Sequence, residues 1–322
     1  MAERRARTHF PSVPVVGRID AATLERRWLA RNEPVVLRLA DSERWRSGWT
    51  PAAICARHAD AIIEAEETRE VYVGERALRP RRLDDAVQAM VRGDTALRWK
   101  GLEFLARVPA MRAELEASPA PYRALLPASA RALRDTLWIA PADTTSSLHH
   151  DGDFDNLNLQ ISGQKLFVLA PPAFRRELYA YGSAESPINP FAPDLARFPR
   201  FARVPVVEAL LRPGDVLFVP KYWWHGVYAV AASVNLSTHF GWAGEPRPWD
   251  VLAGVPLIHR SLTVTAAALK RRRLHRLADA SRRAWYWGYS RLFARVAPQP
   301  RVTLAIEPDG ERAATAVVSA RR

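Results

Sequence analysis

Residues 156–172 read NLNLQISGQKLFVLAPP, the clearest architectural signal in the chain. The first half alternates polar and apolar residues, as a strand does when its two faces meet different surroundings. Ser162-Gly163 then gives a turn signal, and an apolar run from Leu166 to Ala170 ends at Pro171-Pro172. The pattern therefore predicts two strands joined by a tight turn.

Candidate metal ligands stand before and after this pair of strands. His149 and Asp151 lie two residues apart, and residues two apart on a strand point to the same face. His225 ends a second strand-like run, DVLFVPKYWWH, which begins at Asp215 after the turn residues Pro213-Gly214. If these strands face each other, two histidines and one carboxylate can bind one ion and leave its other side open. That donor set is typical of non-heme Fe(II) oxygenases.

Lys165 opens the second strand of the pair. It is one of four lysines, at positions 100, 165, 221 and 270, among 47 basic residues that are otherwise arginine. A lysine beside a buried apolar strand can pair with the carboxylate of a small acid. The alternative is that its side chain extends from the strand edge to solvent.

Four motifs follow one another in the order of a known family: TSSLHHD (145–151), GQKLFVLAPP (163–172), PGDVLFVP (213–220) and YWWH (222–225). With them the chain resembles the JmjC, or cupin-like, hydroxylases, which are Fe(II)- and 2-oxoglutarate-dependent oxygenases. Within that family it resembles the hypoxia-inducible-factor asparaginyl hydroxylase group. The resemblance covers roughly residues 10–242, and three N-terminal segments share it: PVVLRL (34–39), WTP (49–51) and LRWK (97–100).

The resemblance implies a mainly β fold with helices, namely a double-stranded β-helix of the jelly-roll or cupin type. An N-terminal α+β extension and C-terminal helices are expected around it. The short strand spacing between residues 137 and 240 independently favours a closed β architecture. The implied reaction is hydroxylation of a protein side chain or a small molecule, with 2-oxoglutarate and O2 as cosubstrates and release of succinate and CO2. His149, Asp151 and His225 match the family's iron ligands.

The resemblance also assigns cosubstrate contacts. Lys165 matches the residue that pairs with the distal carboxylate of 2-oxoglutarate, and Ser146 matches a hydroxyl that hydrogen-bonds the same carboxylate. Asn156 and Asn235 match polar positions that line the cosubstrate pocket. The chain departs from the asparaginyl hydroxylase in one respect. The stretch from His149 to Lys165 is one residue longer here, and the extra residue falls within residues 152–155. The resemblance therefore does not predict the contacts of those four residues.

Neighbouring residues have competing interpretations. His150 would need a ligand partner at Gly152, which has none, so it is expected to face away from iron and to contribute to the substrate pocket. Trp223 and Trp224 alternate faces, so one belongs to the core and the other, taken as Trp223, lines the pocket. His239 is expected to have a structural role rather than a metal role.

Two other classes of function stay open at this point. A cupin-type metalloenzyme that does not use 2-oxoglutarate would have no need of Lys165 and would be expected to add a fourth protein ligand. A non-catalytic cupin binding protein would be expected if one of the three ligands were missing, and all three are present.

Composition fits an enzyme of the cytoplasm. Apolar residues make up 48% of the 322 residues. The sequence has no run of eighteen uncharged apolar residues, so no transmembrane helix is expected. The N-terminus lacks the apolar segment of a signal peptide. Cys55 is the sole cysteine, which suits a reducing compartment.

The formal net charge is +13 and the isoelectric point is about 10.6. A basic surface attracts nucleic acid or membrane headgroups. The excess of arginine, alanine and proline has a simpler origin in a GC-rich gene, and no nucleic-acid-binding motif is present. We therefore expect a protein or small-molecule substrate as partner, and neither nucleic acid nor a membrane.

Three parts are predicted: a disordered basic arm (1–12), the oxygenase domain (13–245, catalytic core about 136–242), and a helical segment with a mobile tail (246–322). Residues 173–205 form a long insert, and such loops often cover an active site. Beyond residue 246, the apolar stripe of Leu274, Leu277, Trp285 and Leu292 predicts helices that pack on the barrel or pair in a homodimer. The rival interpretation is a helix on a membrane surface.

Overall fold

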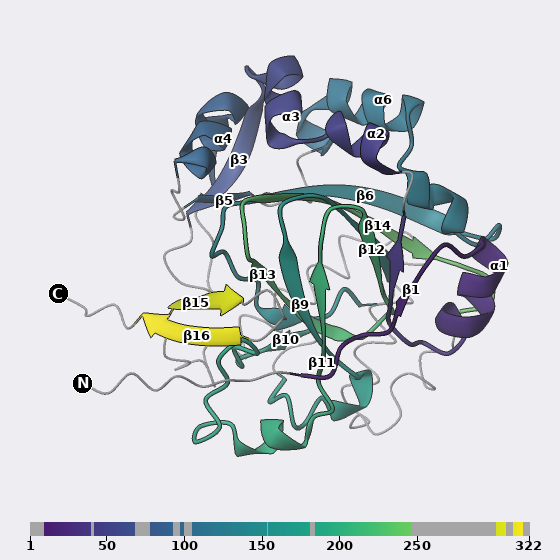
Figure 1. Ribbon diagram of the computed structural model, residues 1–322, viewed down its shortest axis with the longest axis vertical. Helices are drawn as coiled ribbons and strands as arrows, with labels where there is room; N and C mark the ends of the chain where they lie inside the picture. The colour runs from purple at the N-terminus through teal and green to yellow at the C-terminus, as the bar shows by residue number, and fades with distance from the viewer. Residues whose placement is uncertain are drawn as a thin grey trace, which may run out of the picture.

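The computed structural model describes residues 10–39, 42–67, 78–92, 97–99, 105–152, 154–180, 184–245, 301–306 and 312–317. At its centre two β-sheets face each other as a barrel (Figure 1). The jelly-roll or cupin fold expected from the sequence is confirmed. The predicted C-terminal helices with their dimer interface and residues 1–9 of the arm lie outside the described residues.

The first sheet contains six strands, in spatial order β1 (Val15–Val16), β2 (Val35–Arg38), β12 (Asp215–Val219), β8 (Asp155–Ser162), β14 (Ser233–Gly241) and β6 (Arg131–Ala140). The second contains five, in the order β10 (Glu185–Ser186), β7 (Leu148–His149), β13 (Trp224–Ala229), β9 (Lys165–Ala170) and β11 (Val207–Leu211). Strands that follow each other in the chain mostly alternate between the sheets. The predicted strands on either side of Gly163 are therefore both present, but β8 and β9 lie in opposite sheets rather than pairing with each other.

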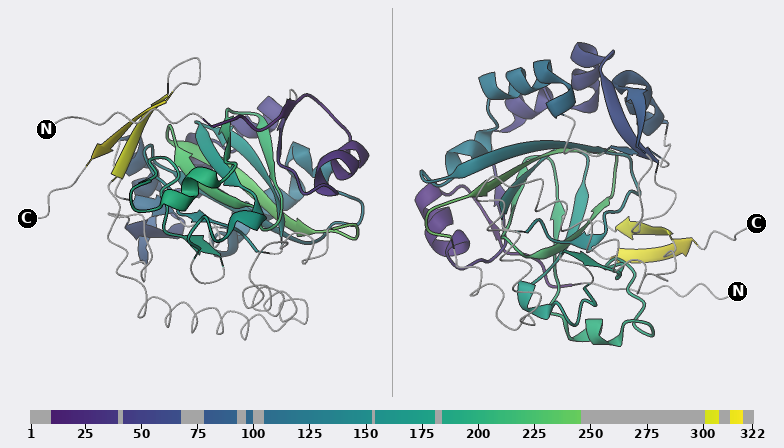
Figure 2. Two further views of the ribbon diagram at one scale, coloured as in Figure 1. Left: turned by 90° about the horizontal axis from the view of Figure 1, so that it is seen from below. Right: turned by 180° about the vertical axis from the view of Figure 1, so that it is seen from behind.

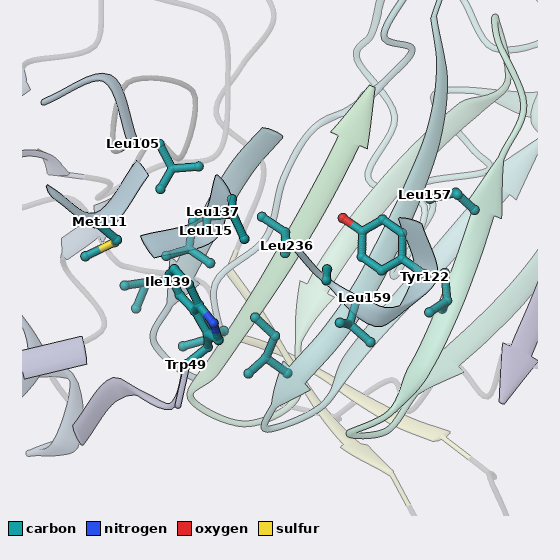
Figure 3. Packing of buried hydrophobic residues seen from close by; sticks show 14 of the residues in the cluster. Trp49, Leu105, Met111, Leu115, Tyr122, Leu137, Ile139, Leu157, Leu159 and Leu236 are labelled. Carbon is teal, nitrogen blue, oxygen red and sulfur yellow. The ribbon is translucent and has the colours of Figure 1, made fainter. Parts of the chain in front are cut away.

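Helices cover the outer face of the six-stranded sheet. They are α1 (Ala21–Leu24) continued by η1 (Glu25–Leu29), α2 (Glu43–Ser47), α3 (Pro51–His58), α4 (Leu83–Val91), α6 (Pro109–Ala117) and η3 (Pro121–Leu125). Seen from behind, α2, α3, α4 and α6 lie along β6 on one side of the barrel (Figure 2). Leu157 and Leu159 of β8 point into this layer, together with Leu236 of β14 (Figure 3). Each fully buried leucine contributes roughly 1.5–3 kcal/mol to stability.

The insert at 173–205 packs mainly against the outer face of the five-stranded sheet. It contains η4 (Pro172–Phe174), β10 and η5 (Pro199–Arg203). Its residues Leu178, Ile188 and Phe191 form one apolar cluster with Trp224 and Tyr228 of β13. Most of the insert's apolar side chains therefore pack on this outer face. For them, the expectation that the insert covers the active site is wrong. Strand β10 pairs with β7 at the edge of the sheet.

The space between the two sheets has an apolar half and a polar half. Leu217 and Val219 of β12 meet Phe167 and Leu169 of β9 in the apolar half. In the polar half, the alternation of β8 and β14 turns the following buried side chains inward: Asn156, Asn158, Gln160, Asn235, Ser237 and His239. The polar positions of the 156–162 stretch thus face the barrel interior, and its leucines face the helices.

Smaller elements lie around the barrel. A three-stranded sheet is made of β4 (Leu78–Arg82), β3 (Ile62–Glu67) and β5 (Leu97–Trp99). A hairpin joins β15 (Arg301–Ile306) to β16 (Arg312–Val317), so part of the tail predicted to be mobile is a strand. Residues 10–13 run beside β11 and hydrogen-bond to Glu208. Among the helices that the structure describes, none combines the length and apolarity that a bilayer span requires.

Gly163 is required at the turn between β8 and β9. Its φ is +68°, and a methyl group there would lie 2.1 Å from the carbonyl oxygen of Ala232. We expect Gly163→Ala to lower the free energy of unfolding by roughly 1–3 kcal/mol from backbone strain alone, with a further loss from the clash. Gly17→Ala is the matched control, because no atom lies within 4 Å of its added methyl group. Urea unfolding that gives equal stability for the two variants would contradict this account.

Candidate metal centre

The site is built on the pairing of β7 with β13. His149 and His225 are direct partners across these strands, and their ring centroids are 4.5 Å apart. Asp151 lies two residues after His149, the last residue of β7. Its Oδ1 is 4.0 Å from Nε2 of His149, and its Oδ2 is 3.6 Å from Nε2 of His225. The three donor atoms lie within 4.8 Å of one another.

Backbone carbonyls orient both imidazoles. Nδ1 of His149 is 2.7 Å from the carbonyl oxygen of Ser147, and Nδ1 of His225 is 3.2 Å from that of Trp223. A carbonyl oxygen only accepts, so each Nδ1 carries the proton and donates it. Each Nε2 therefore keeps its lone pair, and metal-binding histidines need this second contact to fix the ring.

The protonation states suit a cation. Burial, and next the neighbouring ring of His149, lower the pKa of His225 to about 4, so this imidazole is neutral at pH 7. Burial alone would raise the pKa of Asp151, but His239, His225 and the hydrogen bond from His239 outweigh it. They hold the pKa well below its ordinary 3.8. A neutral imidazole and a carboxylate anion are the forms in which histidine and aspartate bind metals.

Backbone contacts hold the segment after Asp151 against the β12–β13 connection. The amide of Tyr222 donates to the carbonyl of Gly152 over 3.0 Å. The amide of Lys221 donates to Oδ1 of Asp155 over 2.9 Å, and Nε1 of Trp242 donates to its Oδ2 over 3.1 Å. Burial raises the pKa of Asp155 to about 7 in spite of these two donors. Gly152 and Asp155, two of the four residues whose contacts the sequence left open, thus connect the two ligand-bearing segments.

The distances and the donor types fit a divalent metal ion. Two atoms that each lie roughly 2.1 Å from one ion are at most about 4.2 Å apart. Oδ1 of Asp151 to His149 and Oδ2 of Asp151 to His225 lie within that limit, and the three donor atoms as a set lie within 4.8 Å, so a small closure of the site would bring all three onto one ion. Two histidines and one carboxylate on one side favour non-heme Fe(II).

Lys165 and Ser146 are both buried. Lys165 is 5% exposed, and its Nζ donates a short hydrogen bond to Oδ1 of Asn235. It pairs across the strands with Ala229, four residues along β13 from His225. The Oγ of Ser146 accepts from the amide of Val227 over 2.9 Å.

Several buried polar atoms on the inner faces have no hydrogen-bond partner among the described residues. They are Thr136 Oγ1, Asn156 Oδ1, Gln160 Oε1 and His239 Nδ1. Leaving a buried polar atom unpaired costs roughly 1–3 kcal/mol. Such an interior fits a polar ligand or ordered water better than an apolar one.

His150 and Trp223, the two residues predicted for the substrate pocket, have different surroundings. His150 is buried edge-on to Trp224, with ring centroids 4.7 Å apart, and its Nδ1 accepts from the amide of Gly152. Trp223 donates from Nε1 to the carbonyl of Asn32 over 2.8 Å and packs beside the apolar half of the interior. Trp224 is a core residue, as expected for one of the pair.

His239 was not among the predicted site residues, yet it contacts Asp151. Its Nε2 lies 3.1 Å from Oδ2 of Asp151 and 3.1 Å from Nδ2 of Asn156. The strand period in residues 235–240 places His239 on the same face as Asn235. That signal was present in the sequence, but the distance to Asp151 depends on the register between β14 and β8.

Comparison with known proteins gives one family match and several partial relatives. The Cupin-like domain family matches residues 21–246. Lysine-specific demethylase 8 of Xenopus tropicalis is 36% identical over 110 residues, which are 33% of this chain and 24% of that protein. The HSPB1-associated protein 1 homolog of Danio rerio is 39% identical over 109 residues, 31% of this chain and 24% of that protein. The chain thus spans about a quarter of the length of these curated relatives.

The pKa of His225 gives a direct test of the site's electrostatics. NMR titration of the metal-free protein should show the His225 ring protonating near pH 4. The unfolded chain takes up this proton near pH 6.5, so the free energy of unfolding should fall as pH is lowered from about 6.5 toward about 4. A His225 midpoint between pH 6 and 7 in the folded protein would show that the ring is not desolvated as described.

Proposed function

The chain belongs to the Cupin-like domain family, and from this membership and the geometry of its metal centre we propose that it is an Fe(II)- and 2-oxoglutarate-dependent oxygenase. The observation that carries the proposal is the convergence of His149, Asp151 and His225 at one end of the polar interior, with Lys165 buried in the same interior. In this proposal the first three residues hold the iron, and Lys165 holds the cosubstrate.

The spacing between metal centre and lysine supports a small dicarboxylate as cosubstrate. Four residues of β13 separate His225 from Ala229, the partner of Lys165, which is roughly 13 Å of extended strand. A lysine side chain and a five-carbon diacid together span such a distance. Ser146, hydrogen-bonded to Val227, lies between these two positions, and Asn235 orients the amine.

When bound, Fe(II) with 2-oxoglutarate and O2 would supply oxidative decarboxylation to succinate and CO2, coupled to hydroxylation of a C–H bond. The chain's own residues bind and orient. The carbonyls of Ser147 and Trp223 fix the two imidazoles, and Lys165 fixes one end of the cosubstrate. The apolar half of the interior, with Phe167 and Leu169, excludes water from that side.

The rival functions predict different surroundings. A cupin metalloenzyme that does not use 2-oxoglutarate would be expected to add a fourth protein ligand. In the part of the chain that the structure describes, the group of converging ligand atoms has three members, and His239 is not among them. A non-catalytic binding protein would have no reason to keep Lys165 buried beside Asn235.

The substrate is proposed at the level of reaction chemistry. The relatives include proteins named lysine-specific demethylases. Hydroxylation of a methyl group on nitrogen leads to its loss as formaldehyde, whereas hydroxylation elsewhere leaves a stable alcohol. One C–H hydroxylation therefore serves either outcome, on a protein side chain or on a small molecule.

Succinate formation tests the proposal. The purified chain should convert 2-oxoglutarate to succinate only with Fe(II) and O2, and faster when the true substrate is added from a panel of peptides and metabolites. His149→Ala, Asp151→Ala and His225→Ala should each abolish iron binding and turnover. His150→Ala is the matched control for iron binding, because this adjacent ring packs on Trp224. Full activity in Asp151→Ala with stoichiometric iron would refute the ligand assignment.

Lys165→Ala tests the cosubstrate role separately. Loss of a buried hydrogen bond to a charged group costs roughly 1.5–3 kcal/mol, so the KM for 2-oxoglutarate should rise about ten- to a hundredfold. The Kd for iron should change little, because the amine bonds to Asn235, which is not a metal ligand. Equal weakening of iron and 2-oxoglutarate binding would assign Lys165 a structural role instead.

A further inference from the structure

His239 is placed to act on the metal centre through Asp151. It lies on the inner face of β14, is 2% exposed, and pairs with Asn156 of β8 across the strands. Nε2 of His239 is 3.1 Å from Oδ2 of Asp151, and Nδ2 of Asn156 is 3.2 Å from the same oxygen. Two nitrogen donors from neighbouring strands thus meet at one carboxylate oxygen.

The two oxygens of Asp151 have different surroundings. Each carboxylate oxygen offers about two lone-pair positions, so two N–H donors satisfy Oδ2. Oδ2 also lies 3.6 Å from Nε2 of His225, but its lone-pair positions are already taken by these two donors. Oδ1 is 4.0 Å from Nε2 of His149, and no hydrogen bond within the described residues reaches it. The oxygen left for a cation is therefore Oδ1.

We propose that His239, with Asn156, is a positioning residue that turns Asp151 so that one of its oxygens binds the ion and the other is withheld from it. The inference rests on the proposed metal centre and goes beyond it, because it assigns a role to a histidine outside the ligand set. Carboxylates bind metals through one oxygen or through both. Binding through one leaves an additional coordination position, and two positions for 2-oxoglutarate and one for O2 are needed.

The chemistry of His239 supports a specific contact over simple packing. Nε2 is 3.1 Å both from Oδ2 of Asp151 and from Nδ2 of Asn156, so the position of the ring proton decides which contact is a hydrogen bond. A lone pair on Nε2 would repel the carboxylate, so we assign the proton to Nε2, which donates to Asp151 and leaves the lone pair on Nδ1. That Nδ1 is buried and has no partner among the described residues. A leucine would fill the position without an unpaired polar atom, so what the imidazole adds is its N–H group at Asp151.

Cobalt(II) binding by the full chain tests this role without turnover. The Kd for Co(II) and its visible absorption spectrum, which reports coordination number and geometry, are measured for the wild type, His239→Leu and His239→Gln. Loss of a group that orients a metal ligand typically weakens affinity about ten- to a hundredfold. We expect that loss and an altered spectrum for His239→Leu. His239→Gln should regain most of the affinity, because its amide N–H can reach Oδ2.

His58→Leu is the matched control. It removes another buried imidazole that contacts a carboxylate, with Nε2 2.8 Å from Oε1 of Glu114, in the helical layer. Its Co(II) affinity and spectrum should equal those of the wild type. Should His239→Leu not fold, as judged by circular dichroism and urea unfolding, His239→Ala replaces it with the same expected loss.

The outcomes separate the two proposals. A wild type that binds no Co(II) at the centre refutes the metal site itself. A wild type that binds, with a His239→Leu variant of equal affinity and identical spectrum, refutes only the role of His239. A His239→Gln variant as weak as His239→Leu would also overturn it, because the donor would then not be what matters.

Discussion

The pairing of β7 with β13 is the constraint on which the site depends. It places His225 directly opposite His149, and Asp151 follows two residues after His149. Strand side chains alternate, so a shift of the register by one residue would turn one of the two imidazoles to the outer face. There it would meet the apolar cluster of Trp224 and the insert instead of its partner. The metal centre thus depends on a register that backbone hydrogen bonds along β9 and β13 hold in place.

Half of the barrel interior is lined by polar side chains, whereas the interior of many small β domains is apolar. The helices outside the barrel make this possible. Leu157, Leu159 and Leu236 bury their side chains outward under α3, α6 and η3, so the core lies between sheet and helices. The inward positions of the same strands are then free to carry amides, a lysine and His239. Buried polar groups of this kind are costly unless they are satisfied. Core packing alone therefore does not explain these buried polar side chains, and their arrangement indicates a binding or catalytic role.

Much of this arrangement could be predicted from local sequence, and the rest could not. Some signals are local. The alternation in residues 156–162 and the turn at Gly163 predicted the two strands, and the spacing of His149 and Asp151 predicted two of the metal ligands. The contact of His239 with Asp151 joins residues 88 apart and depends on how β14 and β8 align. The alternation of strands between two sheets and the face on which the 173–205 insert packs are likewise set by long-range contacts. Here the family resemblance predicted the fold class, while the direction of the insert followed only from its apolar contacts with β13.

The most direct test of the account is a crystal structure of the chain soaked with Mn(II) and 2-oxoglutarate in the absence of iron. Anomalous scattering should show a single manganese peak bounded by His149, Asp151 and His225. The density of a small diacid should extend from that peak toward the amine of Lys165, with one oxygen of Asp151 on the metal and the other on His239. Manganese bound elsewhere, or a diacid that does not approach Lys165, would contradict the central claim that the polar half of the barrel is a metal and cosubstrate site.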